Sequence, residues 1–333
     1  MRVIVPMAGL GKRMRPHTLT TPKPLISIAG KPIVQRLVEY LSEMCDDKIE
    51  HIAFIVGDFG REVEMNLLTI AENLGAVGSI HYQDVPLGTA HAILCAEEHL
   101  KDHVIIAFAD TLFYADFKVN EAADGVIWVQ KVENPQQFGV IKVSEEGHIS
   151  EFIEKSQVFV SDLAIIGIYY FRDGENLKKE LQYLLDNDIK EKGEYQLTTA
   201  MEHMKNKGLK LFPGEVKQWL DCGNKDATVD TNRQVLEHHK NEPLIDSSSI
   251  IENSTIIPPS YIGPEAIIRN SVIGPHVSIG EKSIVESCVL SNSIVQKHSF
   301  IKNRLINNSM VGSYVLLKGQ PQDISIGDYC TDI

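Results

Sequence analysis

The C-terminal part of the chain carries an aliphatic residue at every fifth or sixth position, with Ile-Gly pairs repeated among them. In such a hexapeptide array each side of a triangular coil turns one aliphatic side chain inward, and the coils stack into a parallel β-helix with a continuous core. About four coils fit into residues 244–318. The series is Ile250, Ile256, Ile262, Ile268, Ile273, Ile279 and Val285, and it continues more weakly through Val295, Ile301, Ile306, Val311 and Leu316.

A short apolar run at the N-terminus leads directly into a basic loop that contains glycine. Residues 3–6 read as a strand, and Gly9 and Gly11 follow it closely. Glycine adopts backbone conformations that are closed to other residues and leaves main-chain N–H groups accessible to a polyphosphate. Because Lys12, Arg13, Arg15 and Lys23 add positive charge, the expected guest is a nucleoside triphosphate.

Two well-known glycine motifs do not match this loop. A P-loop would need glycine in place of Pro6 and serine or threonine in place of Arg13, and a dinucleotide fingerprint would need glycine in place of Met14. Residues 8–25, AGLGKRMRPHTLTTPKPL, instead resemble the signature GxGxR(L/M)xPxTxxxPKP(L/M) of the sugar-phosphate nucleotidyltransferases, without a gap. These enzymes join a nucleoside triphosphate to a sugar 1-phosphate. The resemblance implies nucleotide binding by Ala8, Gly9, Gly11, Lys12, Arg13 and Lys23, although many members have threonine or serine where Lys12 stands.

Strand-like and helix-like segments alternate over the first 110 residues. This alternation predicts an α/β fold with a Rossmann-like, mostly parallel sheet and helices on both faces, and ligands in such sheets lie at the carboxyl ends of the strands. Hairpin-like strands follow from residue 125, and a long apolar strand is expected at 163–171. The strands of the first part are expected near 3–6, 51–56, 80–83 and 104–108, and its helices near 32–44, 62–74 and 89–99.

The loop after the third expected strand resembles the base-recognition segment of the same family. Gln83 offers a donor and an acceptor to the edge of a base, and Gly88 lets the backbone approach a flat ring closely. We therefore expect Gln83, Gly88 and Thr89 to bind the nucleotide.

Asp110 stands at the end of a buried strand, where an unpaired carboxylate would be costly without a cation. Mg²⁺ is the natural partner, because it is a hard ion held by one or two carboxylates and by substrate phosphates. The segment Trp219-Leu220-Asp221-Cys222-Gly223 resembles a second family element, which implies that Asp221 joins Asp110 as a metal ligand.

The segments Phe138-Gly139-Val140 and Glu154-Lys155 resemble the sugar 1-phosphate site of the family. Gly139 would let a pyranose ring approach the backbone, Glu154 would accept hydrogen bonds from sugar hydroxyls, and Lys155 would meet the attacking phosphate. Gly167, in the middle of an apolar strand, indicates a close approach by ligand or backbone.

Length and charge set the outer limits of function. We expect a catalytic domain at residues 1–242 and a β-helix domain at 243–333, the latter resembling the left-handed β-helix of longer family members. The net charge of −13 argues against nucleic acid as a partner. No membrane segment or secretory signal is recognisable, and the five cysteines are scattered, which favours a cytoplasmic protein without disulfides.

The leading hypothesis is an enzyme that forms a nucleoside diphosphate sugar and pyrophosphate, with Arg13, Lys23, Asp110 and Lys155 as catalytic residues. Resemblance to long-form thymidylyltransferases favours dTTP with glucose 1-phosphate; GTP with mannose 1-phosphate and UTP with N-acetylglucosamine 1-phosphate stay open. Two other classes are a non-catalytic sensor and an acyltransferase of the hexapeptide type, for which His276 and His298 are candidate general bases. The β-helix is expected to act mainly as a platform for homo-oligomer assembly or regulation.

Overall fold

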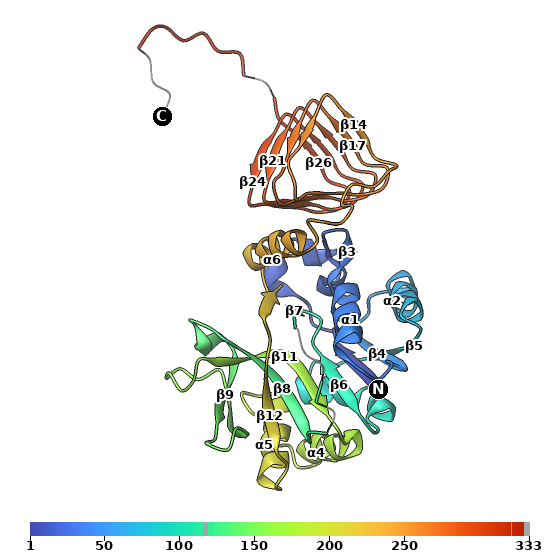
Figure 1. The fold of residues 1–333 in the computed structure, drawn as a ribbon, viewed down its shortest axis with the longest axis vertical. Helices are drawn as coiled ribbons and strands as arrows, with labels where there is room; N and C mark the ends of the chain where they lie inside the picture. The colour runs from blue at the N-terminus through green and yellow to red at the C-terminus, as the bar shows by residue number, and fades with distance from the viewer. Residues whose placement is uncertain (116–118, 121, 321, 330–333) are drawn as a thin grey trace. The chain divides into compact units, whose positions relative to one another are not determined.

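The computed structural model describes residues 1–115, 119–120, 122–320 and 322–329 (Figure 1). Its contacts divide the chain into two units. The first comprises Met1–Ile26 with Pro32–Gly223, and the second comprises Ser27–Lys31 with Asn224–Ile333. Among the described residues, none of the helices combines the length and apolar character needed to cross a bilayer.

The first unit is built on a mixed nine-stranded sheet whose N-terminal half is parallel, as the alternation predicts. Strand β1 (Arg2–Pro6) lies between β4 (His51–Val56) and β6 (Val104–Ala107), and β5 (Val77–Tyr82) follows β4 at the edge. Because these strands run in the same direction, their carboxyl ends meet at one edge of the sheet.

The other half of the sheet is mostly antiparallel. Strand β11 (Leu163–Phe171) pairs antiparallel with β6, β8 (Gly125–Lys131) and β9 (Gly139–Val143). Its register with β8 shifts between Ile165 and Tyr169, where Gly167 has a positive φ of 89°. A hairpin joins β9 to β10 (Ile149–Glu154), β12 (Leu211–Glu215) runs parallel to β8, and β7 (Thr111–Tyr114) forms a separate antiparallel pair with β13 (Gln218–Asp221).

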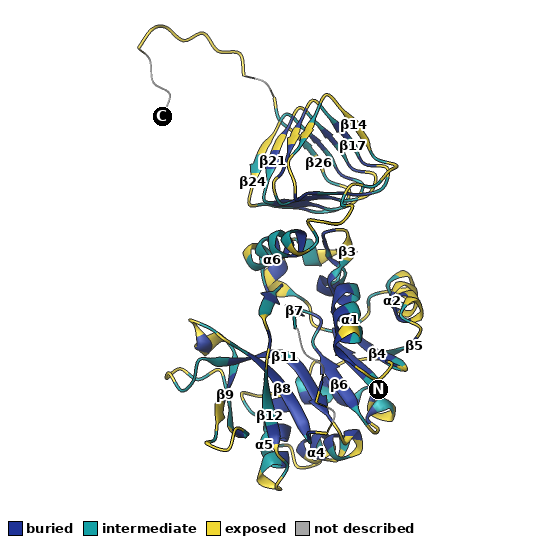
Figure 2. Ribbon diagram, in the orientation of Figure 1, coloured by how far each residue is buried: buried dark blue, intermediate teal, exposed yellow. Residues whose placement is uncertain are grey.

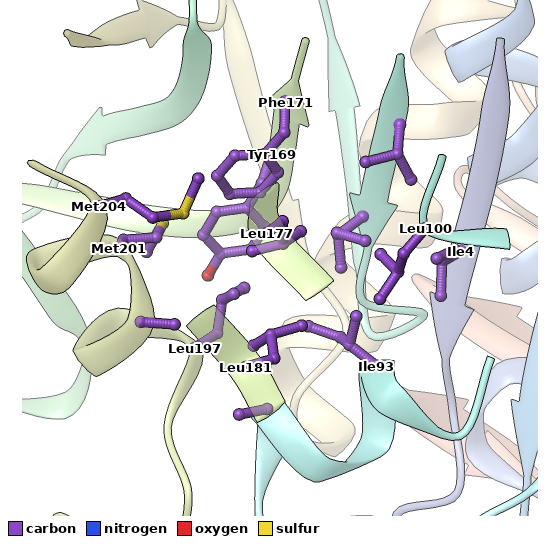
Figure 3. Packing of buried hydrophobic residues seen from close by; sticks show 14 of the residues in the cluster. Ile4, Ile93, Leu100, Tyr169, Phe171, Leu177, Leu181, Leu197, Met201 and Met204 are labelled. Carbon is purple, nitrogen blue, oxygen red and sulfur yellow. The ribbon is translucent and has the colours of Figure 1, made fainter. Parts of the chain in front are cut away.

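Helices cover both faces of this sheet, so the predicted fold class is confirmed. One face packs against α3 (Thr89–Leu94), α4 (Gly174–Asp186) and α5 (Leu197–Asn206); Figure 3 shows Ile4 and Ile93 in the same buried cluster as Leu181. The other face contacts α2 (Arg61–Asn73), since a side chain at Gly78 would lie 3.0 Å from Leu68 and Ala71. Helix α1 is Ile33–Met44, strands β2 and β3 are Ser27–Ile28 and Lys31–Pro32, and the 3₁₀ turns η1 to η5 are Lys12–Met14, His17–Leu19, Lys23–Leu25, Glu97–His99 and Pro135–Gln137.

The second unit contains three parallel sheets of short strands, which is the architecture of a left-handed β-helix. Partners in successive coils are 16 or 17 residues apart, as in the register Ile267↔Ile284↔Phe300. The first sheet holds β14 (Ile250–Glu252), β17 (Ile267–Arg269), β20 (Ile284–Glu286), β23 (Phe300–Lys302) and β26 (Leu316–Lys318). The second holds β15 (Thr255–Ile256), β18 (Val272–Ile273), β21 (Val289–Ser291) and β24 (Leu305–Asn307), and the third holds β16 (Tyr261–Ile262), β19 (Val277–Ile279), β22 (Ser293–Val295) and β25 (Met310–Val311).

Most of the aliphatic series read from the sequence lies in the interior of the coils, but Leu316 at its end is 68% exposed, and the neighbouring Leu317 packs against the core instead. Ile262, Ile268 and Ile279 are fully buried, and Figure 2 shows the buried strands of the stack concentrated along one of its sides. Ile250 is 44% exposed because it lies in the first coil, whereas Leu290 is fully buried and was not recognised in the series.

Helix α6 (Lys225–His238) belongs to the second unit by its contacts, although it precedes the domain boundary expected at residues 242–243. The physical reason is a buried polar network: Asn232 Oδ1 accepts hydrogen bonds from Ser278 Oγ (2.7 Å) and from the main-chain N–H of Ala29 (3.0 Å). His276, a candidate general base in the sequence, lies 2.8 Å from Glu237 of α6 through Nε2. The other candidate, His298, stacks on Tyr314 with ring centroids 4.9 Å apart.

Candidate active site

A cleft of about 440 Å³ lies where β1, β5 and β6 end, the position expected for a ligand in a sheet of this kind. Its volume falls within the range of small-molecule sites. The cleft is lined by residues from the loops that follow these strands, together with Glu194 and Gly223 from later segments. All the residues predicted to bind nucleotide line it: Ala8, Gly9, Gly11, Lys12, Arg13, Lys23, Gln83, Gly88, Thr89 and Asp110.

The loop after β1 needs glycine at one of its two candidate positions. Gly11 has a φ of 57°, and a Cβ there would lie 3.0 Å from Thr18 Cγ2 and 3.1 Å from Lys23 Cβ. The Thr18 hydroxyl donates a hydrogen bond to the Gly11 carbonyl (2.8 Å), which holds this turn. Gly9 is different, because a Cβ at Gly9 would meet no atom within 4 Å and would only narrow the open side of the cleft.

Lys23 and Asp110 form an ion pair in this cleft. The Lys23 Nζ lies 3.0 Å from Asp110 Oδ2; the lysine side chain is 9% exposed and the aspartate side chain 50% exposed. A buried lysine is tolerated when a carboxylate neutralises it. The pair therefore places a fixed cation and a solvent-accessible carboxylate side by side.

Asp221 lies next to Asp110, as the sequence suggests for a shared cation site. It ends β13 and pairs with Thr111, and the N–H of Cys222 donates to the Asp110 carbonyl (3.1 Å). Burial raises the pKa of the Asp221 carboxyl above its ordinary value, and the charge of Asp110 raises it further. A hydrogen bond from Gly223 and the charges of Lys23 and Arg13 act in the opposite direction.

A divalent cation fits these two residues. Two neighbouring carboxylates, one half-buried and carrying a raised pKa, supply hard oxygen donors whose mutual repulsion a cation would relieve. Asp110 is open to solvent and the cleft beside it has room for phosphate oxygens, which Mg²⁺ takes as further ligands.

The raised pKa of Asp221 predicts a stability effect. A carboxyl whose pKa is raised on folding destabilises the folded state above that pKa, and this penalty vanishes at a pH below the ordinary carboxyl pKa of about 4. Asp221→Asn should therefore raise the melting temperature of the metal-free protein at pH 7. The gain should shrink as the pH approaches 4, as measured by thermal unfolding monitored by circular dichroism. Asp186→Asn is the control for an equal change of charge. A melting temperature of Asp221→Asn at pH 7 that is equal to or lower than that of the wild type would contradict this assignment.

The far end of the cleft is formed by Gln83 and Gly88. The Gln83 Nε2 donates to the Gly88 carbonyl (3.1 Å) and lies 3.1 Å from His91 Nδ1, an acceptor in neutral histidine. Burial lowers the pKa of His91, which favours that neutral form. Thr89 Oγ1 accepts from the N–H of Leu197 (2.9 Å), so this loop is anchored to the start of α5.

A single methyl group added at Gly88 should have a large effect on stability and on nucleotide binding. Its φ is 119°, and a Cβ there would lie 2.4 Å from the Tyr195 carbonyl oxygen, which cannot move without breaking the Ala90–Tyr195 hydrogen bond. Gly88→Ala should lower the free energy of unfolding by about 2–4 kcal/mol and weaken nucleotide binding. Urea unfolding and nucleotide titration measure the two effects. Gly147→Ala is the matched control, because Gly147 has a φ of 83° but no atom within 4 Å of the added Cβ; equal losses in both variants would refute the steric argument.

Three of the residues predicted for the sugar phosphate, Gly139, Glu154 and Lys155, lie outside this cleft and form a group of their own. A Cβ on Gly139 would lie 3.0 Å from Glu154 Oε2, and Glu154 Oε1 lies 3.4 Å from Lys155 Nζ. Lys155 has a 56% exposed side chain. Gly167 lies apart from them, where its carbonyl accepts from the N–H of Phe108 (2.9 Å) on the cleft wall.

Tyr169 and Trp219 connect this group to the nucleotide cleft. Burial raises the pKa of the Tyr169 hydroxyl, and the charges of Glu154 and Asp110 raise it further, so both carboxylates act on one side chain. Trp219 packs edge-on against Phe138 (5.0 Å between ring centroids) and donates from Nε1 to Thr111 Oγ1 (2.6 Å).

The lining residues to which the sequence assigned no role include Glu194, Gly223 and Phe108. Glu194 precedes α5, and its Cβ lies 3.0 Å from a Cβ built on Gly88; no spacing in the sequence links it to the loop after β5. Gly223 belongs to the recognised pentapeptide with Asp221. Phe108 ends the apolar run before Asp110. In such a run, the sequence does not distinguish an aromatic residue that lines a cleft from one that packs in the hydrophobic core.

A nucleotidyl transferase family model matches residues 2–238. The chain is 31% identical to the low-salt glycan biosynthesis nucleotidyltransferase of Haloferax volcanii, covering 71% of the chain and 66% of the relative. It is 28% identical to the bifunctional protein GlmU of Methanocaldococcus jannaschii, covering 77% of the chain and 60% of the relative. The chain therefore spans less than two thirds of the length of each of these two relatives. It is 32% identical to the mannose-1-phosphate guanylyltransferase catalytic subunit beta of Drosophila melanogaster, covering 96% and 87%.

Solved structures share the fold. A crystal structure described as a glucose-1-phosphate thymidylyltransferase from Bacillus anthracis superposes with a TM-score of 0.59 at 24% identity, covering 70% of this chain and 94% of the other. UDP-glucose pyrophosphorylase complexed with UDP-glucose gives a TM-score of 0.58 at 22% identity, covering 71% and 98%. Together with the family match over residues 2–238, the sequence identities to curated relatives show that the chain belongs to the nucleotidyl transferase family.

Proposed function

We propose that the protein transfers a nucleotidyl group from a nucleoside triphosphate to a sugar 1-phosphate, releasing pyrophosphate. The observation that carries this proposal is the single cleft that holds the glycine loop, Lys23, Asp110 and Gln83 together. A triphosphate fits a cleft that is lined by the cations and main-chain N–H groups of the glycine loop and also by Gln83 and Gly88.

In this reaction the protein contributes mainly the positioning of the substrates and the neutralisation of charge. A sugar phosphate oxygen attacks the α-phosphorus in line, and the bond from that phosphorus to the bridging oxygen breaks, so its electron pair leaves with pyrophosphate. The nucleophile is already an anion, so no general base is required. Catalysis then depends on holding the groups in line and neutralising the charge that develops.

Each charged residue has a proposed role in this scheme. Arg13 and the loop N–H groups hold the β- and γ-phosphates, Lys23 meets the α-phosphate, and Lys155 meets the sugar phosphate. Asp110 and Asp221 would hold Mg²⁺. When bound, this ion would supply positive charge to the phosphate oxygens. The exposed side chain of Lys155, which pairs with Glu154 at 3.4 Å, would turn toward the phosphate of an incoming sugar.

The contacts of Gln83 favour bases with a ring N–H group. Both donors of its amide nitrogen have partners in Gly88 and His91, so the carbonyl oxygen Oε1 is the group that can face a base. That acceptor matches the ring N–H of thymine, uracil or guanine. The corresponding ring nitrogen of adenine or cytosine is itself an acceptor, so dTTP, UTP and GTP are preferred over ATP and CTP.

The substrate pair is a further proposal. We keep dTTP with glucose 1-phosphate as the first choice from the sequence. The relative that spans nearly the whole chain is named for mannose 1-phosphate and guanylyl transfer, which makes GTP with mannose 1-phosphate the second pair. UTP with N-acetylglucosamine 1-phosphate is the third.

A pyrophosphate-release panel tests the proposal. The full chain is incubated with Mg²⁺ and each of the five triphosphates against glucose, galactose, mannose and N-acetylglucosamine 1-phosphates. We expect release that requires both substrates and is fastest with one of the three named pairs. Binding of triphosphate without release from any pair would favour the sensor hypothesis and overturn the proposed activity.

A further inference from the structure

Three histidines gather on one face of the sheet, outside the residues that line the cleft. His51 begins β4, His81 lies on the edge strand β5, and His99 ends η4. The register pairs Ala53 with Ser79 and Ile55 with His81, so His51, Ser79 and His81 point to the same side of the sheet. No step of the proposed reaction uses these three imidazoles.

The imidazoles converge on a single hydroxyl group. Ser79 Oγ lies 2.8 Å from His51 Nε2, 2.8 Å from His81 Nε2 and 3.3 Å from His99 Nε2. A serine hydroxyl carries one hydrogen, so it can donate to only one of these nitrogens. His51 also stacks on His99, with ring centroids 3.9 Å apart, which fixes the orientation of both rings.

A carboxylate completes the group. Glu98 Oε1 lies 3.3 Å from His99 Nε2, and one ligand atom from each of His81, Glu98 and His99 falls within 4.8 Å of the other two. In a tetrahedral shell with bonds of about 2.0–2.1 Å, neighbouring donor atoms are roughly 3.3 Å apart. The spacing of the donors thus already approaches that of a metal shell. The Glu98 side chain is 69% exposed and the His99 side chain 14% exposed, so the group is open to solvent on the glutamate side.

The protonation state of the imidazoles also suits a metal. Burial lowers the pKa of His51, His81 and His99, and the mutual repulsion of the rings lowers that of His51 and His99 further, with His99 reaching about 4. Neutral imidazole is the form that coordinates metal ions. The charges that face the group are Glu98, which attracts a cation, and Arg2, which opposes it. Arg2 is paired with Asp102 (2.9 Å), which reduces that opposition.

We propose that His81, His99 and Glu98 form a binding site for a divalent transition-metal ion of the zinc type, with the Ser79 hydroxyl or a water as the fourth ligand. Two imidazoles and one carboxylate favour zinc or cobalt over Mg²⁺, which prefers oxygen donors alone. The ion would join the edge strand β5 to η4. Since Gln83 follows β5 directly, the site would also fix the strand that leads into the nucleotide cleft.

The test is a titration of the chelator-treated full chain with Co²⁺ and Zn²⁺ in excess Mg²⁺. Tetrahedral Co²⁺ absorbs visible light far more strongly than the octahedral aqua ion, so the spectrum reports the geometry directly. We expect one tetrahedral Co²⁺ per chain, displaced by Zn²⁺. His81→Ala and Glu98→Gln should each weaken Zn²⁺ binding by at least about 100-fold. Glu98→Gln alters an exposed side chain and should leave the metal-free melting temperature unchanged, which guards against loss of binding through misfolding.

Two control variants sharpen the result. His148→Gln removes a histidine that also lies beside a glutamate, 3.6 Å from Glu146, in the β9–β10 hairpin, and should keep full binding. Asp110→Asn should also keep the Co²⁺ spectrum, which separates this site from the proposed Mg²⁺ site and from the proposed activity. Absence of the strong visible band, or Zn²⁺ affinity that is equal in the wild type, His81→Ala and Glu98→Gln, would overturn the assignment and leave a hydrogen-bonded histidine cluster.

Discussion

Replacing Asp110 with asparagine should lower kcat by about 10³-fold or more without unfolding the protein. The carboxylate is half exposed, so its loss costs little packing, but it removes the partner of Lys23 and one of two proposed cation ligands. Asparagine keeps the shape and one oxygen of the side chain. The loss should therefore come from charge and appear in pyrophosphate release under saturating substrates.

The control for Asp110→Asn is Asp186→Asn, an equal change of charge at the exposed end of α4. It should retain full activity. Circular dichroism and melting temperature establish that both variants fold. Pyrophosphate release by Asp110→Asn within tenfold of the wild type would remove Asp110 from the catalytic residues.

Substitution of Lys23 should have an effect of similar size. Lys23 is 7% exposed, lies 3.0 Å from Asp110, and lowers the pKa of Asp221 by its charge. Lys23→Ala should reduce kcat by about 10²–10³-fold, because a positioned cation in a cleft stabilises the developing negative charge far more than a cation in water. Lys23→Met separates charge from packing, since it keeps the aliphatic stem that lies against Gly11.

The pH profile adds a second readout for Lys23. With the ammonium group gone, the pKa of Asp221 should rise further, so the acidic limb of the kcat profile should move to higher pH. Lys179→Ala, on the exposed surface of α4, should change neither kcat nor this limb. Full activity of Lys23→Met, with an unmoved acidic limb, would show that Lys23 serves only to neutralise Asp110.

The sequence predicted several strands of the sheet well because their signals are local. The strand at 51–56 and the apolar strand at 163–171 match β4 and β11, since each is a compact apolar run bounded by polar residues or glycine. The expected helix at 89–99 is instead α3 (Thr89–Leu94) followed by the separate turn η4 (Glu97–His99). The chain turns at Ala96, where φ is −112° and ψ is 34°. The conformational preference of alanine does not predict these values.

Other elements depend on partners that are distant in the sequence. Strands β7 and β13 pair residues about a hundred positions apart, and neither was expected as a strand. That pairing brings Asp221 to Asp110, so the proposed cation site rests on a contact that only the family resemblance suggested. The position of Glu194 on the cleft wall, opposite Gly88, likewise follows from tertiary packing and has no local signal.

The sugar half of the site was the least accessible to sequence reasoning. The motifs identified Gly139, Glu154 and Lys155 as a group, and the structure places the three together. It does not place them on the wall of the nucleotide cleft. Tyr169 and Trp219 connect these three residues to the nucleotide cleft. In the sequence, both aromatic residues are equally typical of an ordinary hydrophobic core.

The constant register of the β-helix has a consequence for how this chain can change in length. Every strand of one coil pairs in register with the strand 16 or 17 residues further on, and the same face of each strand points inward throughout. Loss or gain of a whole coil would therefore leave each remaining side chain on its own face. Insertion of one residue within a strand would instead exchange its inner and outer faces, bringing charged side chains such as Arg269 and Glu286 into the apolar interior. The stack can therefore gain or lose a full coil, but it does not tolerate an insertion or deletion of fewer residues.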